Sequence, residues 1–525
     1  MRSRLLRNQK LTMYGTTLPA LQGKRIQMSD FKRQHPISIF VSFFGNLKQM
    51  IITLIVLFFF GSSQTRGPWF YFLVLGALLV FSFLSGFLHW LTFRYRLDEQ
   101  ELHIRQGLIF RKKRYIHQDR VQSIDLNAKL IQRMFNLVEV RIETAGGGDE
   151  PEFRIIALNK EEANDIRNEL LYGKKKRETE APDSDGNSVL SEEEIDEETV
   201  SKEPDYTWKL STKRLITAAL TSSGIGVAAT FVAALFSQVQ QFIPETWYET
   251  AIGFVVESSV LFILSFLILV LVIAWLIRIV STVLKYGNFS IEKTGNDIVI
   301  ARGLLERRQL TLNRRRITAV RLVQNVLRQP FGYTSVYVES AGGGTKDEDL
   351  STILIPLCKE TEVKAHLEKI VPDFAFERPL TGLPKKSMKR YMVRLTVPAV
   401  IAASAITYFF DYGAYSFAAI IVALLMGYWQ YKDAGIGVNE RFLWMRMRKF
   451  ARTTVIVPKK RIQTVEVTSN PLQRLNQLTT LEVSILTSIT GKTFSLRHLS
   501  KQQSMNYYMW YSYEHSTKYN EETKS

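Results

Sequence analysis

The sequence predicts a multi-pass α-helical membrane protein with three β-rich barrel modules, each capped by a C-terminal helix, in a threefold internal repeat. Three observations lead to this fold class. Long uncharged runs fall into three pairs, and a polar stretch of roughly eighty residues or more follows each pair. The same residue types also recur at the same spacings in all three polar stretches.

The overall composition resembles that of a soluble enzyme, with 46% hydrophobic and 22% charged residues among 525, but the apolar residues are concentrated in a few runs. That concentration excludes a purely cytosolic globular protein. The single cysteine, Cys358, excludes an intramolecular disulfide framework and a Cys-rich metal site. The formal charge of +18 is typical of proteins that bind nucleic acid or the surface of an anionic membrane. The apolar runs make the membrane surface the simpler partner.

The apolar runs cover residues 49–63 and 69–93, 215–239 and 252–277, and 395–410 and 413–431. About 20 apolar residues at a rise of 1.5 Å cross a hydrocarbon core of roughly 30 Å, so we expect six spanning helices. The first and fifth runs are short, and a re-entrant or surface helix is the alternative for each. Residues 37–47 could also lie flat at the interface. Spanning is preferred because an unpaired span would place one polar stretch opposite the others.

The distribution of Lys and Arg predicts the orientation. The hairpins within the pairs, at residues 61–68, 240–251 and 411–412, contain one basic residue, Arg66, whereas the opposite helix ends are rich in Lys and Arg. By the positive-inside rule, both termini and all three polar stretches are expected in the cytoplasm. The first 36 residues lack an apolar core, so no cleavable signal peptide is expected, and residues 1–27 could be an upstream extension without a structural role.

The three polar stretches align on Arg120, Arg316 and Arg461, which we call the anchor arginines. Apolar residues recur eighteen positions before each anchor arginine and one, four, eleven and twenty positions after it. The first two copies share a Gly triplet that includes Gly146 and Gly342, and the third copy lacks it. These arginines and glycines are therefore predicted to be equivalent structural positions of one repeated unit.

Each unit is expected to combine short strands with one final helix. The alternation in residues 138–142 is typical of a half-buried strand, and Gly107 and Gly303 between strand-like runs predict a turn or bulge. Ser500, followed three residues later by Gln503, fits the capping box that begins a helix. An antiparallel sheet closed on itself and plugged by the helix would remove exposed edges.

This arrangement resembles the bacterial pleckstrin-homology (PH) domain membrane proteins of the YdbS/YdbT-like group. The resemblance rests on the paired helices, the Arg-(Ile/Val)-x-x-(Ile/Val) pattern of each module and its terminal helix, and the threefold repetition is similar to the larger, YdbT-like type. It implies a PH-like barrel in each module and does not imply an enzyme activity. It also makes a smaller YdbS-like protein, with one such module, a natural partner.

An acidic segment separates the first module from the second helix pair. Residues 178–205 contain twelve Asp and Glu and one Lys, so a disordered linker is expected, either as a plain spacer or as a competitor of anionic lipid for the basic face. The predicted domains are a basic N-terminal segment (1–36), helix pair 1 (37–93), module 1 (94–172), the acidic linker (173–206), helix pair 2 (207–286), module 2 (287–372), helix pair 3 (373–431), module 3 (432–516) and a tail (517–525).

Motifs for catalysis and metal binding are missing from the sequence. It contains no Walker-type phosphate loop, no His-Glu-x-x-His pair and no Gly-x-Ser-x-Gly elbow. We therefore expect no catalytic residue, no metal site and no cofactor. Glu257, near the outer end of the fourth run, is the one residue that suggests an ion path.

Clusters of basic residues carry the functional hypothesis. A basic residue beside an anionic leaflet gains about 1 kcal/mol, although membrane topology and solubility explain the same charges equally well. The anchor arginines are expected to pair with carboxylates inside the fold rather than with a ligand. The candidate membrane-surface or partner-binding residues are Arg111, Lys112, Lys113, Arg114, Arg307, Arg308, Arg314, Arg315, Arg448, Lys449, Lys459 and Lys460.

These observations together predict an integral protein of the bacterial plasma membrane that presents cytoplasmic PH-like modules for protein or lipid-surface binding. It would act as a scaffold or assembly element, with a role in envelope stress or antimicrobial resistance. The alternative is a transporter or channel component with regulatory modules. The expected partners are the anionic lipid surface, a smaller YdbS-like protein and further copies of the chain, and nucleic acid is not expected.

Overall fold

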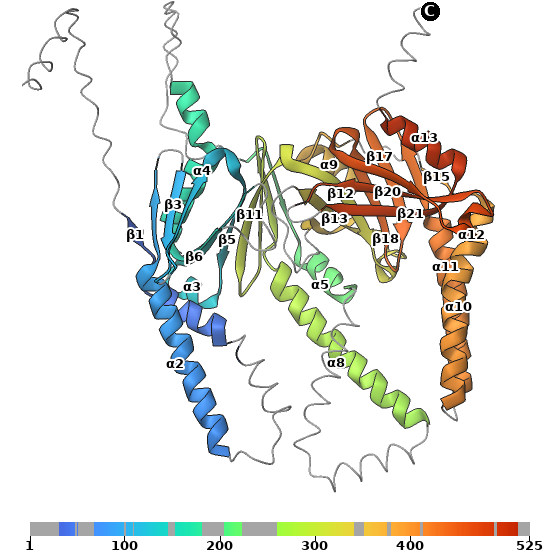
Figure 1. Ribbon diagram of the computed structural model, residues 1–525, viewed down its shortest axis with the longest axis horizontal. Helices are drawn as coiled ribbons and strands as arrows, with labels where there is room; N and C mark the ends of the chain where they lie inside the picture. The colour runs from blue at the N-terminus through green and yellow to red at the C-terminus, as the bar shows by residue number, and fades with distance from the viewer. Residues whose placement is uncertain are drawn as a thin grey trace, which may run out of the picture.

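The computed structural model describes residues 31–47, 50, 68–98, 101–108, 110–144, 153–180, 204–222, 260–340, 351–374, 380–409, 413–487 and 491–512 (Figure 1). These residues form three units with the same order of elements. Each unit begins with a short strand, continues with helical segments, and then has three strands, a 3₁₀ turn, three more strands and a closing helix.

Unit 1 contains β1 (Lys32–Arg33), α2 (Pro68–Thr92), β2 (Arg94–Leu97), β3 (Glu101–Gln106), β4 (Lys112–His117), η1 (Gln118–Arg120), β5 (Val121–Ala128), α3 (Leu130–Met134), β6 (Leu137–Thr144), β7 (Phe153–Asn159) and α4 (Lys160–Glu180). Unit 2 contains β8 (Tyr206–Lys209), α5 (Thr212–Leu220), α8 (Val260–Tyr286), β9 (Ser290–Thr294), β10 (Asp297–Arg302), β11 (Arg307–Asn313), η3 (Arg314–Arg316), β12 (Ile317–Gln324), η4 (Val326–Arg328), β13 (Tyr333–Ser340), β14 (Thr352–Lys359) and α9 (Val363–Ile370).

Unit 3 contains β15 (Thr381–Gly382), α10 (Lys385–Phe409), η6 (Gly413–Phe417), α11 (Ala418–Asp433), β16 (Gly435–Val438), β17 (Phe442–Arg448), β18 (Arg452–Pro458), η7 (Lys459–Arg461), β19 (Ile462–Thr468), α12 (Pro471–Arg474), β20 (Leu478–Ile485), β21 (Lys492–Ser500) and α13 (Lys501–Tyr511). The N-terminal end of α13 has the expected capping box, because the Ser500 hydroxyl accepts from the Gln503 N–H at 3.1 Å.

Four helices in the described residues are long and apolar enough to cross a membrane: Leu73–Thr92, Ile268–Tyr286, Lys385–Phe409 and Gly413–Asp433. They correspond to the second, fourth, fifth and sixth predicted runs. The fifth run, short in the sequence, belongs to a helix of 25 residues that starts upstream at its basic end. The first run and most of the third lie outside the described residues. Residues 38–47 form a shorter helix beside α2, where the Ser82 hydroxyl donates to the Phe43 carbonyl at 3.1 Å.

The helix pairs are insertions between the first two strands of a module. Unit 3 shows this most completely, since α10 follows β15, α11 leads into β16, and these two strands pair, with Thr381 opposite Ile436. Both ends of the helix pair are therefore held at one edge of a sheet. The helices of all three units extend to the same side of the modules (Figure 1).

The strands form four antiparallel sheets that cross the boundaries between modules. Their orders are β1-β2-β3-β4, then β7-β6-β5-β11-β10-β9-β8, then β14-β13-β12-β18-β17-β16-β15, and finally β19-β20-β21. The three β-rich modules are confirmed, but the described strands form no closed barrel. Strands β5, β11, β12 and β18, which a barrel would join within one module, pair with the neighbouring module instead.

Each module still has its own hydrophobic core, and the cores reach across the shared sheets. The core of module 2 contains Phe442, Trp444 and Ile456, which belong to strands β17 and β18 of module 3. Trp444 is fully buried there, and the Phe442 ring lies 6.0 Å from that of Phe374. Separation of modules 2 and 3 would therefore expose large apolar side chains, which makes the pair one packed body.

Candidate functional site

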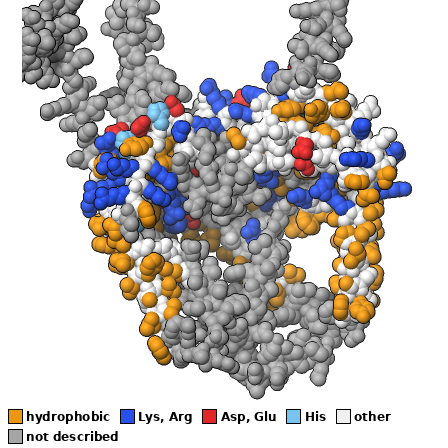
Figure 2. Space-filling view, in the orientation of Figure 1, with side chains coloured by type: hydrophobic (Ala, Val, Ile, Leu, Met, Phe, Trp, Pro, Cys, Tyr) orange, Lys and Arg blue, Asp and Glu red, His pale blue; other side chains and the backbone are white. Residues whose placement is uncertain are grey.

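The basic residues singled out in the sequence divide into two groups. Most of them are exposed, and these are Arg111, Lys112, Lys113, Arg114, Arg307, Arg315, Lys449 and Lys460. The remaining four are less exposed and contact other parts of the fold: Arg308 pairs with Asp125, Arg314 with Asp373 and Arg448 with Asp433, and Lys459 lies over the Trp510 ring. Among the exposed residues, Arg114 also lies over the Phe153 ring. Figure 2 shows Lys and Arg side chains gathered where the apolar helices enter the modules.

Three equivalent hairpins, β3–β4, β10–β11 and β17–β18, have tips that touch the membrane helices, and Arg111, Lys112, Arg307 and Lys449 lie at or next to these tips. Arg315 and Lys460 lie instead in the 3₁₀ turns at the other ends of β11 and β18. In module 1 the tip and the end of α2 line one cavity of about 400 Å³, to which Lys112 also contributes. In module 2 the Leu304 N–H donates to the Leu284 carbonyl of α8 at 3.0 Å. In module 3 the Gln430 side chain of α11 donates to the Lys449 carbonyl at 2.9 Å. The hairpins are thus held next to the ends of the helices.

Each hairpin tip also exposes a large apolar side chain. Phe110 is 82% exposed, Phe450 is 78% exposed, and Leu305 occupies the tip in module 2. The turns of the first two hairpins contain Gly107 and Gly303 with φ of 98° and 104°, where any Cβ would collide with a carbonyl oxygen across the turn. An apolar tip flanked by basic residues has the composition of a surface that meets an anionic bilayer.

A buried ion pair joins modules 1 and 2. Strand β5 runs antiparallel to β11, with Arg308 opposite Asn127. The Asp125 side chain is 3% exposed and accepts two hydrogen bonds from Arg308, from Nε at 3.0 Å and from Nη2 at 2.5 Å. Asn127 donates to the Glu306 carboxylate at 2.5 Å across the same boundary. The Asp125 carboxylate is removed from water, so its desolvation is offset by the Arg308 guanidinium of the next module.

A second junction joins modules 2 and 3 through strands β12 and β18. Gln324 accepts from Arg452 Nε at 2.6 Å. The fully buried Glu339 of module 2 pairs with Lys492 of module 3 at 3.2 Å and with Arg321 of its own module at 3.1 Å. These contacts connect the middle of the shared sheet with strand β21 of the neighbouring sheet, so the junction involves both halves of module 3.

The two junctions use the same register once the repeat is aligned. Arg307 lies opposite Ala128 in the first junction, and Arg452 lies opposite Gln324 in the second. Both arginines stand nine residues before an anchor arginine, and both of their partners stand eight residues after one. The contact between modules is therefore itself part of the repeated unit.

The anchor arginines end equivalent 3₁₀ turns and also link the modules. Arg316 donates to the Val121 carbonyl of module 1, and Arg461 donates to the Arg315 carbonyl of module 2. Their hydrogen-bond acceptors are backbone carbonyls of the preceding module, and Arg316 also interacts electrostatically with the Asp297 carboxylate of its own module. Arg120 belongs to the first of the three modules, and its side chain is exposed and makes no hydrogen bond within the described part of the chain.

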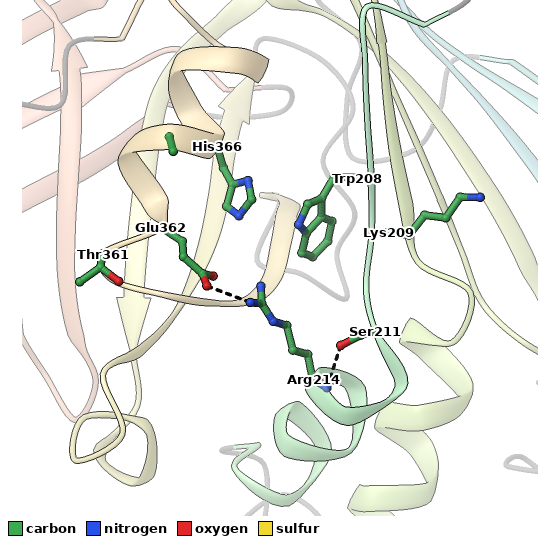
Figure 3. A pocket seen from close by; sticks show the side chains of 8 residues that line it. Trp208, Lys209, Ser211, Arg214, Thr361, Glu362 and His366 are labelled. Carbon is green, nitrogen blue, oxygen red and sulfur yellow. Dashed lines mark hydrogen bonds and ion pairs between the residues drawn. The ribbon is translucent and has the colours of Figure 1, made fainter.

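A groove of about 640 Å³ lies where α5 meets module 2, lined by residues that include Trp208, Arg214, Glu362 and His366 (Figure 3). Arg214 Nη2 donates to Glu362 at 2.9 Å. Burial raises the pKa of Glu362, but hydrogen bonds from Arg214 and the Lys359 backbone outweigh it and lower the pKa overall. Burial likewise lowers the pKa of His366, whose Nδ1 lies 2.9 Å from the Tyr206 hydroxyl. Arg214 and Glu362 are hydrogen-bonded to each other, and so are His366 and Tyr206. The contact between Arg214 and Glu362 attaches α5 to module 2.

Sequence reasoning missed the residues that join the modules. Asp125 and Glu339 were not identified as contacts between modules, because β5 and β13 contain other polar residues as well and an acidic residue in such a strand gives no separate signal. Arg308 was assigned to the outer surface because its partner is distant in the sequence, and Arg448 because its partner Asp433 lies in the preceding membrane helix. Gly146, Gly342 and most of the acidic linker lie outside the described residues, although α4 continues to Glu180.

The comparison with known proteins agrees with the three units. A family model described as "Bacterial PH domain" matches residues 43–174, 249–371 and 393–514. The UPF0699 transmembrane protein YdbT of Bacillus subtilis (strain 168) is 33% identical over 493 residues, which cover 93% of this chain and 99% of that protein. No solved structure matches the chain.

Proposed function

The chain belongs to the bacterial PH domain family, and from that premise we propose that it is a membrane-anchored scaffold that presents three coupled PH modules as one platform on the cytoplasmic face of the plasma membrane. The observation that carries the proposal is the continuity of the sheets through both junctions. Independent modules on separate anchors would need no buried contacts between them. A platform whose parts are fixed relative to one another positions partners at set distances, which is what a scaffold does.

The cytoplasmic side is supported by charge. The first turns of α10, beside module 3, contain four basic residues, whereas the far ends of the apolar helices are almost free of them. Lys and Arg near the ends of membrane spans favour the cytoplasm. The apolar helices α2, α8, α10 and α11 extend to one side of the platform, so a single orientation serves the three modules (Figure 1).

The membrane surface is the first contact that this platform makes. The three hairpin tips lie beside the helices and combine Phe110, Leu305 or Phe450 with basic neighbours. Insertion of a Phe side chain contributes about 1.5–3 kcal/mol, and each basic residue near an anionic leaflet contributes about 1 kcal/mol. The tips would therefore hold the platform close to the bilayer, with its far side open to the cytoplasm.

Depth-dependent quenching in vesicles tests this arrangement. An environment-sensitive dye on a Phe450→Cys variant, reconstituted as the full chain, should be quenched by lipids brominated on their acyl chains, and more strongly in vesicles with anionic lipid. The control carries the dye on Lys501→Cys in α13, which is also exposed. Equal quenching at the two positions would overturn the proposed contact between tips and bilayer.

The alternative of a transporter or channel component is separated by flux. Glu257, the residue that suggested an ion path, lies outside the described residues. Vesicles containing the full chain should show no solute or ion flux above that of empty vesicles if the chain is a scaffold. Flux above that level would contradict the proposal.

A further inference from the structure

The row of three modules has two unlike ends. Within the described residues, β4 of module 1 pairs only with β3, and β19 of module 3 pairs only with β20. The equivalent strands inside the row each have a second neighbour, since β11 pairs with β5 and β18 pairs with β12. Among the described strands, module 1 thus has an open edge at β4, and module 3 has an open edge at β19. These are the two kinds of edge that pair with each other at the internal junctions.

The side chains at the two ends are exposed where their equivalents are buried. In β5, residues 123–128 are all buried, whereas most of the equivalent residues of β19 are exposed. Tyr115 in β4 is 60% exposed, but Thr311, which takes its place in β11, is 3% exposed. The difference arises because the neighbouring module covers β5 and β11, whereas no described module covers β4 and β19.

We propose that β19 of one copy pairs with β4 of a second copy, antiparallel and in the register of the two internal junctions, so that copies join head to tail in the membrane. In that register Arg111 of one copy lies opposite Ser469 of the other. Arg111 stands nine residues before Arg120, and Ser469 stands eight residues after Arg461. These are the repeat positions that face each other in both internal junctions.

The charges of the two edges are complementary in this register. Glu466 of β19 takes the place of Asp125, and Lys112 of β4 takes the place of Arg308, so the ion pair of the first internal junction would be repeated between copies. Arg114 would lie directly opposite Glu466, and opposite charges at facing positions of an antiparallel pair contribute roughly 0.2–1 kcal/mol. A strand edge with basic side chains also repels a second copy of itself, which favours the unlike edge.

The geometry permits repetition within one membrane. The step from module to module leaves the helices on the same side of the row, so the same step between copies keeps all helices in the same bilayer (Figure 1). Arg120 would then reach the turn of the next copy, as Arg316 and Arg461 reach the turns of their preceding modules. A heterologous contact of this kind produces a ring or an open row. The inference rests on the proposed function only in that the platform lies on one face of the membrane.

Disulfide formation between two singly substituted chains tests the register. Lys112 and Thr468 are both exposed and would face each other, so chains with Lys112→Cys and chains with Thr468→Cys, co-reconstituted at full length, should give a disulfide-linked dimer. The matched control pairs Lys112→Cys with Thr464→Cys, an exposed position about 13 Å further along the strand. Cys358 is fully buried and its pKa is raised to about 12, so it adds little background.

A dimer with Thr468→Cys at least tenfold more abundant than with Thr464→Cys would support the inference. No dimer, or equal yields, would overturn it. With the disulfide at Arg111→Cys and Ser469→Cys, Glu466→Lys should lower the dimer yield several-fold, because like charges at facing positions are destabilising. Changing Lys112 and Arg114 to Glu in the partner copy should restore the yield. Failure of this restoration would count against the ion pair as the determinant of register.

A photoreactive residue in place of Lys113, introduced in cells, identifies the occupant of β4 in native membranes. An adduct of two 60.4-kDa chains supports the inference, whereas an adduct with a smaller protein, or a crosslink within one chain, overturns it. These assays measure assembly alone. The quenching assay measures contact with lipid alone, so the failure of one is distinguishable from the failure of the other.

Discussion

Asp125→Ala should open the junction between modules 1 and 2. The substitution leaves the Arg308 guanidinium, which is 16% exposed, without the carboxylate that accepts both of its hydrogen bonds. Loss of one partner of a buried pair costs about 3–5 kcal/mol, because the remaining charge is desolvated and uncompensated. The residual exposure of Arg308 places the expected cost near the lower limit, at about 3 kcal/mol.

Hydrogen–deuterium exchange of the full chain in nanodiscs measures this cost locally. If the two strands exchange by opening of the junction, a loss of about 3 kcal/mol accelerates exchange of the β5 and β11 amides by roughly 100-fold. The amides of β20 and β21, in the distant sheet of module 3, should be unaffected.

Two further variants decide whether the ion pair is the cause. Asp125→Leu combined with Arg308→Met should regain most of the protection, since no uncompensated charge remains. Glu368→Gln removes an exposed pair with Lys364, at 3.8 Å, and should change the free energy of opening by less than about 1 kcal/mol. Unchanged exchange in β5 and β11 of Asp125→Ala would refute the junction as described.

Three other outcomes are expected. Burial, and then nearby arginines, lower the pKa of His498 to about 4, so the unfolded state takes up the proton first, and module 3 should lose about 3 kcal/mol as the pH falls from about 6.5 to 4. A thermal melt series should show this loss, and His498→Asn should flatten it. Glu339→Ala removes the buried carboxylate that pairs with Lys492 and Arg321 and should cost about 3–5 kcal/mol, which urea titration followed by intrinsic tryptophan fluorescence would measure. Cys358 should react with a maleimide only on unfolding, because burial raises its pKa to about 12, and rapid labelling of the folded protein would contradict its position in the core.

The helices and the repeat could be predicted because both leave a signal in the sequence itself. Membrane helices need long apolar runs, and the anchor arginines recur with their apolar neighbours at fixed spacings. The first strand of each module was missed, since Lys32–Arg33 and Thr381–Gly382 are two residues long and Tyr206–Lys209 is four. Such short segments have no alternation to detect, and only pairing with β2, β9 or β16 makes them strands.

The junctions could not be predicted because strand pairing between modules is not local. Asp125 and Arg308 are separated by more than a module in the chain, and a basic residue in a strand has the same sequence signature whether its partner is solvent, lipid or a distant carboxylate. The β-rich modules could be predicted, but the continuation of their sheets into the next module could not, for the same reason. Local sequence patterns predict the strands of each module. They do not predict which strand of another module pairs with an edge strand, because that depends on contacts distant in the sequence.

The continuity of the three modules is tested most directly by a disulfide within one chain. Arg307 and Ala128 face each other across the first junction, so a chain with both changed to Cys, and with a protease site inserted between residues 190 and 191, should remain one band after cleavage and oxidation. Reduction should then release two fragments. A control with Ala128→Cys and Arg315→Cys should separate without reduction. Separation of the Arg307→Cys and Ala128→Cys chain before reduction would contradict a shared sheet.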